Sequence, residues 1–246
     1  MTEHNNRVAL VTGGSRGIGA AIVRRLSANG FAVAFTYATS VNAAMALTDE
    51  IRAQGGLAAS FQADNADDKA LRTVVASVVE QFGRLDVLVN NAGGGTFGPL
   101  EDMPTSEIFR MIDVNIRGLV VATKAAIPHL GSGGRIINIG SVNADRTPFP
   151  GGSIYSMTKG AVAGFTRALS RELGPQGITV NNVQPGPISA APVPPRRSGT
   201  DALRAQIAVD RYGTTSEVAA FVAYLTGDDA GYITGASLNI DGGFSA

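Results

Sequence analysis

Short apolar runs alternate with amphipathic helical patterns along the whole chain. The apolar runs predict strands at residues 8–11, 32–37, 58–62, 85–89, 135–139, 179–183 and 237–240. Apolar positions that recur at spacings of three and four predict helices at residues 19–29, 42–54, 67–82, 106–129, 156–173 and 216–226. Mostly apolar strands separated by such helices favour parallel pairing with right-handed crossovers. The pattern therefore predicts an α/β fold, a doubly wound parallel sheet with helices on both faces.

No composition break or Pro/Ser-rich linker divides the chain, so residues 1–246 are expected to form one domain. Ligands of doubly wound sheets bind beyond the carboxyl ends of the strands. We therefore searched for chemistry in the residues directly after each strand.

A glycine-rich turn, TGGSRGIG at residues 12–19, joins the first strand to the first helix. Such a turn directs backbone N–H groups and the positive end of the helix dipole at one point, which suits a phosphate. We expect Gly13 to permit the tight turn, Gly17 to let a diphosphate approach the backbone and Gly19 to pack the helix on the strand. Glycines also occur in turns that bind nothing, but the strand before and the helix after favour a dinucleotide site.

The end of the second strand indicates which dinucleotide is bound. NAD-binding chains usually carry an acid there for the ribose 2′-hydroxyl, whereas residues 27–48 contain no Asp or Glu. Tyr37, Thr39 and Ser40 are uncharged instead, and Arg16 stands in the glycine turn. A 2′-phosphate needs cationic and hydroxyl donors, so we predict NADP(H). The alternative is that Arg16 is a solvated loop charge.

Two further loops follow strands. Asp64 and Asn65 come after the third strand and offer a carboxylate and an amide to an adenine edge, or else they cap the helix that follows. The fourth strand leads into NNAGGG at residues 90–95, whose small residues permit close approach of a ring or a ribose.

Candidate catalytic groups follow the fifth strand. Ser141 stands just after it, and Tyr155 and Lys159 lie four residues apart on one face of the next helix. A Tyr-x-x-x-Lys pair is common on protein surfaces, but this one stands in a chain that begins with a dinucleotide turn.

Composition excludes several classes of function. Lys+Arg 20 balance Asp+Glu 20, so no basic field is present for nucleic acid or anionic lipid. Cys 0 rules out disulfides and thiol catalysis, and neither histidine has companions at metal-ligand spacing. The N-terminus has no signal-type apolar segment and no run is long enough to span a bilayer. We expect a cytoplasmic protein with no nucleic-acid, membrane or metal partner.

Taken together, these motifs resemble the short-chain dehydrogenases/reductases of the single-domain type, and the resemblance covers the whole chain. The matching features are the glycine turn, NNAG at residues 90–93, Asn115, Ser141, Tyr155, Lys159, Pro185 with Gly186, and IDGG at residues 240–243. The resemblance implies a seven-stranded parallel sheet (a Rossmann fold), a nicotinamide cofactor and a catalytic set of Asn115, Ser141, Tyr155 and Lys159. It also implies a homotetramer joined through the helices at residues 106–129 and 156–173.

The resemblance further implies a role for each group. Lys159 also holds the nicotinamide ribose, Asn115 positions water in a proton relay, and the turn with Ile188 lies against the nicotinamide. The residues expected to bind NADP(H) are Gly13, Ser15, Arg16, Gly17, Ile18, Gly19, Tyr37, Thr39, Ser40, Asp64, Asn65, Asn91, Ala92, Gly93, Tyr155, Lys159, Pro185, Gly186 and Ile188.

Residue types also suggest a mechanism for reducing a carbonyl. Tyr155 can donate the proton, and Ser141 can orient the substrate oxygen. A neighbouring Lys159 ammonium is expected to lower the phenol pKa from its ordinary value of ~10.

The substrate is less well defined by the sequence. We expect a small or medium uncharged ketone (or, in reverse, its alcohol) against residues 94–97, Val142, Asn143, Phe149 and Ile154, under a lid at about 187–210. Acyl-carrier-linked reductases of this family generally have basic residues before the fifth strand, where this chain has GSGG at 131–134. A 3-oxoacyl thioester reductase is therefore the alternative enzyme, and a non-catalytic nucleotide-binding or sensing protein is the alternative class.

Overall fold

Seven parallel strands form the central layer of the computed structural model, which describes residues 6–189 and 201–246. Their order across the sheet is β3-β2-β1-β4-β5-β6-β9. The strands are β1 Val8–Val11, β2 Ala32–Tyr37, β3 Ala58–Gln62, β4 Val87–Asn90, β5 Arg135–Ile139, β6 Thr179–Pro185 and β9 Ser237–Ile240. Every neighbouring pair is parallel. The predicted doubly wound, seven-stranded fold is confirmed.

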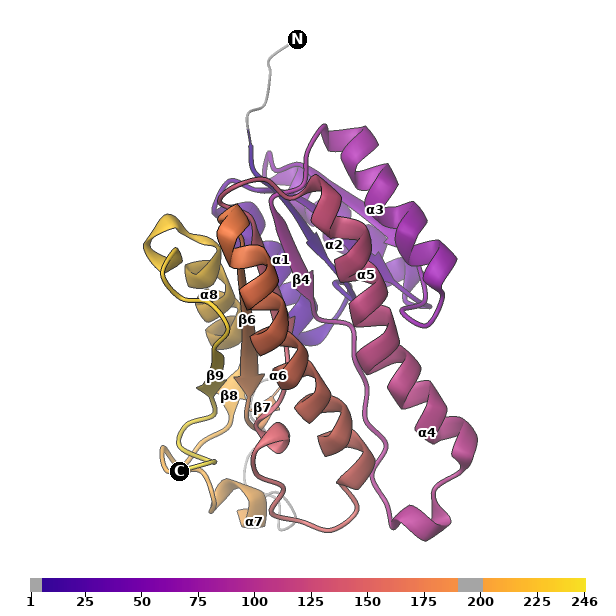
Figure 1. The fold of residues 1–246 in the computed structure, drawn as a ribbon, viewed down its shortest axis with the longest axis vertical. Helices are drawn as coiled ribbons and strands as arrows, with labels where there is room; N and C mark the ends of the chain where they lie inside the picture. Colours follow the sequence, from indigo (N-terminus) through magenta and orange to yellow (C-terminus); the bar gives the residue numbers. More distant parts are fainter. Residues whose placement is uncertain (1–5, 190–200) are drawn as a thin grey trace.

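Helices cover both faces of this sheet (Figure 1). They are α1 Gly17–Ala28, α2 Val41–Ala53, α3 Asp68–Phe82, α4 Thr105–Ile112, α5 Gly118–Ala126, α6 Ser153–Leu173, α7 Asp201–Arg204 and α8 Thr215–Thr226. Alternate residues of a strand point to opposite faces. Ala9 and Val11 of β1 accordingly pack with α1, α2 and α8, whereas Val8 and Leu10 pack with α3, α5 and α6. Each strand thus supplies two apolar cores, which explains its continuous apolar sequence.

The predicted elements differ from the observed ones mainly at their ends. The helix predicted at residues 106–129 is divided into α4, a π-turn at Asp113–Arg117, α5 and a 3-10 turn at Ile127–His129. The predicted lid begins with a short strand, β7 Ile188–Ser189, which pairs with β8 Gly213–Thr214 just beyond the predicted end of the lid. Residues 190–200 of the predicted lid lie outside the described residues.

A ladder of buried side chains ties the helices to the sheet. The Asn90 amide donates to the Thr123 hydroxyl of α5 and to Oδ1 of Asn138, both at 2.9 Å. The Asn138 amide in turn donates to the Thr166 hydroxyl of α6 at 2.9 Å. Because buried polar groups are costly unless they are bonded, this ladder fixes α5 and α6 against β4 and β5.

Within the described residues, no helix is both long enough and apolar enough to cross a membrane.

The ladder predicts a stability effect. Asn90→Ala removes the donor to Asn138 and leaves a buried oxygen without a partner, so we expect the free energy of unfolding to fall by about 1–3 kcal/mol. Asn42→Ala on the exposed side of α2 is the matched control and should change it by less than about 0.5 kcal/mol. Urea unfolding of both variants measures the difference, and equal values would contradict a structural role for the ladder.

Candidate active site

A cavity of about 980 Å³ opens at the carboxyl ends of β1, β2, β4, β5 and β6. Every residue that the sequence analysis assigned to catalysis or to cofactor binding lines it. The lining also includes residues that the analysis did not name as site residues: Thr36, Ala38, Ala63, Glu107, Arg110, Met111, Val114, Ile139 and Gly140. Lining the cavity brings these groups together but does not test the role of each one.

The glycine turn forms one end of the cavity. Gly13 and Gly17 have φ values of +64° and +53°, which L side chains rarely adopt. A Cβ at Gly19 would lie 2.3 Å from the Gly13 carbonyl oxygen, so the close packing of α1 requires glycine there. No side chain caps the first turn of α1, whose N-cap is Arg16. The backbone N–H groups of that turn are therefore available to an anion.

Threonine hydroxyls hold the turn in place. Thr12 Oγ1 accepts hydrogen bonds from the N–H groups of Asn91 and Ala92, both at 3.0 Å, and so joins the β1 and β4 loops. Thr36 Oγ1 accepts from the Gly13 N–H at 2.9 Å. Thr36 was missed by the sequence analysis because it is buried in β2 and reads as an ordinary strand residue.

The end of β2 carries no charge, as expected. Tyr37 and Ser40 are half-buried and Thr39 is exposed, and the exposed Arg16 of the glycine turn lines the same cavity. Asp64 and Glu107 are the acids in the lining of the cavity. This wall therefore places a guanidinium and hydroxyl groups together without a carboxylate from β2.

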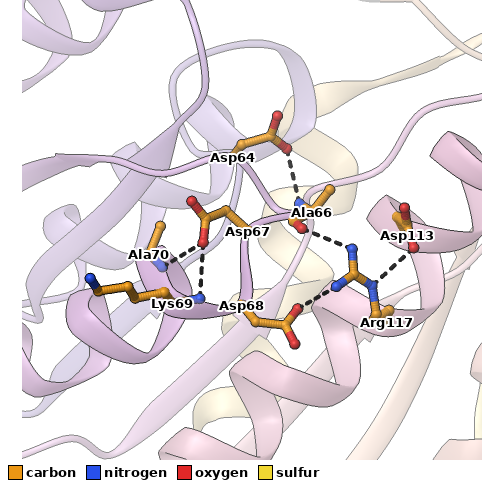
Figure 2. Close-up of polar contacts among 8 residues, drawn as sticks. All are labelled: Asp64, Ala66, Asp67, Asp68, Lys69, Ala70, Asp113 and Arg117. Atoms are coloured by element: carbon orange, nitrogen blue, oxygen red, sulfur yellow. Dashed lines mark hydrogen bonds and ion pairs between the residues drawn. The ribbon is translucent and has the colours of Figure 1, made fainter.

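Asp64 is held on the cavity wall by two elements. Its carboxylate accepts from the Ala66 N–H at 2.9 Å and from Arg110 of α4 at 2.9 Å. Burial raises the pKa of the Asp64 carboxyl, but the Ala66 N–H and the Arg110 guanidinium outweigh it and lower the pKa below its ordinary value. Asp67, rather than Asp64 or Asn65, caps α3 by accepting from Lys69 and Ala70 (Figure 2).

The candidate catalytic groups form the other end of the cavity. Tyr155 and Lys159 lie one turn apart near the start of α6, and the Lys159 Nζ lies 5.7 Å from the centre of the tyrosine ring. Lys159 is buried and donates to the Ile139 carbonyl at 2.9 Å. Burial lowers the pKa of Lys159 to about 8.

The expected effect of Lys159 on Tyr155 is wrong for this structure. Burial raises the pKa of the Tyr155 phenol above its ordinary value, and a hydrogen bond with the Ser141 side chain only partly opposes that rise. The Lys159 ammonium instead donates to the Ile139 carbonyl, a contact across 20 positions that no local sequence pattern indicates.

Asn115 lies in the π-turn, 2 % exposed, against the glycines of the β4 loop. Its Oδ1 accepts from the Gly94 N–H at 3.0 Å, and its amide donates to the Gly94 carbonyl at 2.8 Å and to the Thr158 hydroxyl at 3.0 Å. Asn115 therefore connects the β4 loop with α6 at the base of the Tyr155–Lys159 turn.

An aromatic wall borders the catalytic end. The Phe97 ring packs against Tyr155, with centres 5.2 Å apart, and against Phe149, with centres 5.8 Å apart. Residues 94–97 line the cavity as expected. Val142, Asn143, Phe149 and Ile154, which were expected beside them, are not part of the lining. Val142 is buried beside Ile207 in a separate apolar cluster.

The loop after Ser141 rests on the C-terminal segment. Val142 packs with Phe244, and the Arg146 guanidinium lies over the Phe244 ring and donates to its carbonyl oxygen. The position of Ser141 thus depends on contacts with residues about a hundred positions further along the chain.

Within the described parts of the chain, no group of three or more His, Cys, Asp or Glu side chains could hold a metal ion.

Comparison with known proteins places the fold and cavity in a family. Residues 13–245 match a family model described as enoyl-(acyl carrier protein) reductase. The cyclic-di-GMP-binding biofilm dispersal mediator protein of Escherichia coli (strain K12) is 44% identical over 246 residues, which cover 100% of both chains.

Two solved structures are more alike in sequence. The short-chain dehydrogenase/reductase from Serratia marcescens BCRC 10948 is 52% identical, with a TM-score of 0.95 over 98% of each chain. A short chain dehydrogenase from Burkholderia cenocepacia J2315 in complex with NADP is 47% identical, with a TM-score of 0.94 over 98% of each chain. Sheet order, sequence identity and coverage agree, and the chain belongs to the short-chain dehydrogenase/reductase family.

Proposed function

We propose that this protein is an NADP(H)-dependent reductase of a small or medium ketone, which also oxidises the corresponding alcohol. The observation that carries this proposal is the arrangement of functional groups along one continuous cavity. Its glycine end suits a diphosphate, and its other end brings together Asn115, Ser141, Tyr155 and Lys159.

The residues present fit NADP(H). The uncapped first turn of α1 offers N–H groups to the diphosphate. Arg16, Thr39 and Ser40 offer a cation and hydroxyl groups to a 2′-phosphate, with no carboxylate on β2 to repel it. The NADP complex of the Burkholderia relative supports the same choice.

The nicotinamide end is expected to lie against Pro185, the last residue of β6, and Gly186 and Ile188, which follow it; all three line the cavity. A Cβ at Gly186 would lie 2.6 Å from the Asp241 Cβ, so this turn is packed closely against the C-terminal segment. Asp64 and Asn65 border the adenosine end.

When bound, NADPH supplies a hydride to the carbonyl carbon of the substrate. Tyr155 gives its phenolic proton to the carbonyl oxygen as that oxygen gains negative charge. Ser141 donates a hydrogen bond to the same oxygen and orients it. The Lys159 ammonium, one helical turn away, is the group we assign to holding the nicotinamide ribose. A proton from solvent water then restores the Tyr155 phenol, and we assign Asn115 to positioning the water that delivers it.

Two other functions have specific support and are tested against this one. A 3-oxoacyl-[acyl-carrier-protein] reductase of Staphylococcus aureus (strain Mu50 / ATCC 700699) is 40% identical over 245 residues, 96% of each chain, which favours a 3-oxoacyl thioester. The Escherichia coli relative is named for cyclic-di-GMP binding, which favours a binding or sensing role. Retention of all four candidate catalytic groups argues for chemistry, because a sensor has no need of them.

Purified protein should be incubated with NADPH and a panel of ketones, β-keto esters, quinones and acyl thioesters while absorbance of NADPH is followed. Consumption with ketones supports the proposal, and consumption confined to thioesters favours the alternative enzyme. No consumption with any carbonyl, together with NADPH binding, would favour the sensing role.

We also propose a homotetramer. Phe109 of α4, Val120 of α5 and Met157 of α6 are exposed apolar side chains on the helices through which related enzymes assemble. Light scattering of the purified chain tests this assembly.

The first prediction concerns cofactor choice. Arg16→Ala removes the cation proposed to meet the 2′-phosphate, so the ratio of kcat/KM for NADPH over NADH should fall by about tenfold. Arg25→Ala, an exposed change on the same helix outside the cavity wall, is the matched control and should leave the ratio unchanged. A wild-type ratio that already favours NADH would contradict the choice of NADP(H).

The second concerns the proton donor. Tyr155→Phe keeps the ring packed on Phe97 but removes the hydroxyl, so turnover should be lost while the Kd for NADPH, measured by fluorescence titration, changes little. Substantial remaining activity in this variant would refute the role of Tyr155.

The third concerns pH. Because burial lowers the pKa of Lys159 to about 8, its ammonium is present below that pH and is lost above it. Reduction, measured as kcat/KM, should therefore be nearly constant below pH 8 and should fall as pH rises through it. Lys159→Arg keeps its charge throughout this range. Whatever its absolute rate, the kcat/KM of that variant should not fall near pH 8. If kcat/KM falls near pH 8 in both proteins, deprotonation of Lys159 is not the cause.

A further inference from the structure

The helix that carries Asn115 is not a regular α-helix. Between α4 and α5, the Gly118 N–H donates to the carbonyl of Asp113, five residues back, and forms a π-turn. In a regular α-helix this N–H would donate to the carbonyl of Val114, four residues back. Such single turns commonly occur at functional sites, and this one contains Asn115. The position of Asn115 therefore depends on whatever stabilises the turn.

Asn65 provides a partner for the displaced carbonyl. Its Nδ2 donates to the Val114 carbonyl at 2.7 Å, across 49 positions of sequence. The Asn65 residue is only 7 % exposed, so this bond forms where water competes little. Asn65 Oδ1 is buried and has no hydrogen-bond partner among the described residues. The hydrogen bond from Nδ2 to the Val114 carbonyl is therefore the contact that holds this side chain.

The loop that carries Asn65 is pressed against the π-turn. A Cβ at Gly118 would lie 1.9 Å from the Asn65 carbonyl oxygen, so only glycine permits this approach. Arg117 joins the same two segments from the outside: it donates to the Ala66 carbonyl at 2.9 Å and pairs with Asp68 at 2.8 Å and with Asp113 at 2.9 Å. Figure 2 shows its guanidinium between these three groups.

We propose that Asn65 is a positioning residue for the reaction: its amide holds the Val114 carbonyl in the π-turn, and the turn presents Asn115 to Gly94 and Thr158. This inference rests on the proposed function in that it concerns the same site. It replaces the expectation that the Asn65 side chain serves adenine. The exposed ion pairs of Arg117 contribute little to stability by themselves. The turn therefore depends mainly on the buried hydrogen bond from Asn65 to the Val114 carbonyl.

Asn65→Asp tests the donor itself. The change keeps the shape of the side chain but sets a carboxylate oxygen against the Val114 carbonyl, which opens the contact. We expect kcat to fall about tenfold or more, because small displacements of catalytic groups are costly, while the Kd for NADPH stays within about threefold. A rise in the Kd for NADPH with unchanged kcat would overturn the proposal in favour of an adenine contact.

Reduced nicotinamide mononucleotide, which lacks the adenosine half of the cofactor, separates the two roles further. If Asn65 positions the π-turn, Asn65→Asp loses the same factor in rate with this shortened cofactor as with NADPH. If Asn65 contacts adenine, the variant and the wild type react equally with it, and the proposal fails.

Asn181→Asp is the matched control. Asn181 of β6 is likewise buried, and its amide donates to the Ile233 carbonyl at 2.6 Å, away from the π-turn and next to the edge strand β9. This variant should lower the Tm without reducing kcat at a temperature where it is folded. An equal loss of kcat in Asn181→Asp would show that general destabilisation explains the effect and would overturn the proposal.

Gly118→Ala reaches the same contact from the other side, because its Cβ displaces the Asn65 backbone. It should reproduce the kcat loss of Asn65→Asp, whereas Gly164→Ala on α6, where a Cβ meets nothing within 4 Å, should not. Wild-type kcat in Gly118→Ala would contradict the proposal.

Hydrogen exchange gives a readout that needs no substrate. The Gly94 N–H donates to Asn115 Oδ1, so peptides that cover Gly94 should exchange faster in Asn65→Asp than in wild type and at the wild-type rate in Asn181→Asp. Unchanged exchange in Asn65→Asp would overturn the inference. If wild type reduces no carbonyl, the proposed function fails, and this measurement still decides the role of Asn65.

Discussion

The buried hydrogen bond between the Lys159 ammonium and the Ile139 carbonyl is the contact on which the site depends. It holds α6 against the end of β5. Ser141 lies just after that strand, and Tyr155 of α6 is close enough to contact Ser141. A buried cation is costly unless it is hydrogen-bonded, and the ladder from Asn90 through Asn138 to Thr166 holds the helix in the position that provides this bond. The catalytic end of the cavity thus follows from the way in which one helix is fixed to one strand.

Much of the fold could be predicted because its signals are local. Strand and helix periodicity, glycines at positive φ and the four-residue spacing of Tyr155 and Lys159 are all contained in short windows of sequence. The carboxyl-end rule for parallel sheets then gathers residues from distant windows into one cavity, which is why the residues predicted for catalysis and cofactor binding all line it.

What the sequence did not reveal depends on contacts between distant segments. The pairing of Arg110 with Asp64, the hydrogen bond from the Gly13 N–H to Thr36 and the hydrogen bond from Asn65 to the π-turn join residues that are 23 to 49 positions apart. The periodic pattern of apolar residues in the sequence does not indicate these contacts. The raised pKa of Tyr155 was missed for a related reason, because burial of the phenol and the carbonyl partner of Lys159 are properties of the packed molecule.

The contact of Arg146 and Val142 with Phe244 has a consequence for biosynthesis. A ribosome makes the glycine turn more than two hundred residues before position 244. Helix α1 packs against α8, so both ends of the cavity wait for segments that are made late. Because a single domain folds as a unit, the phosphate cradle and the catalytic loop gain their support together, once these later segments have left the ribosome.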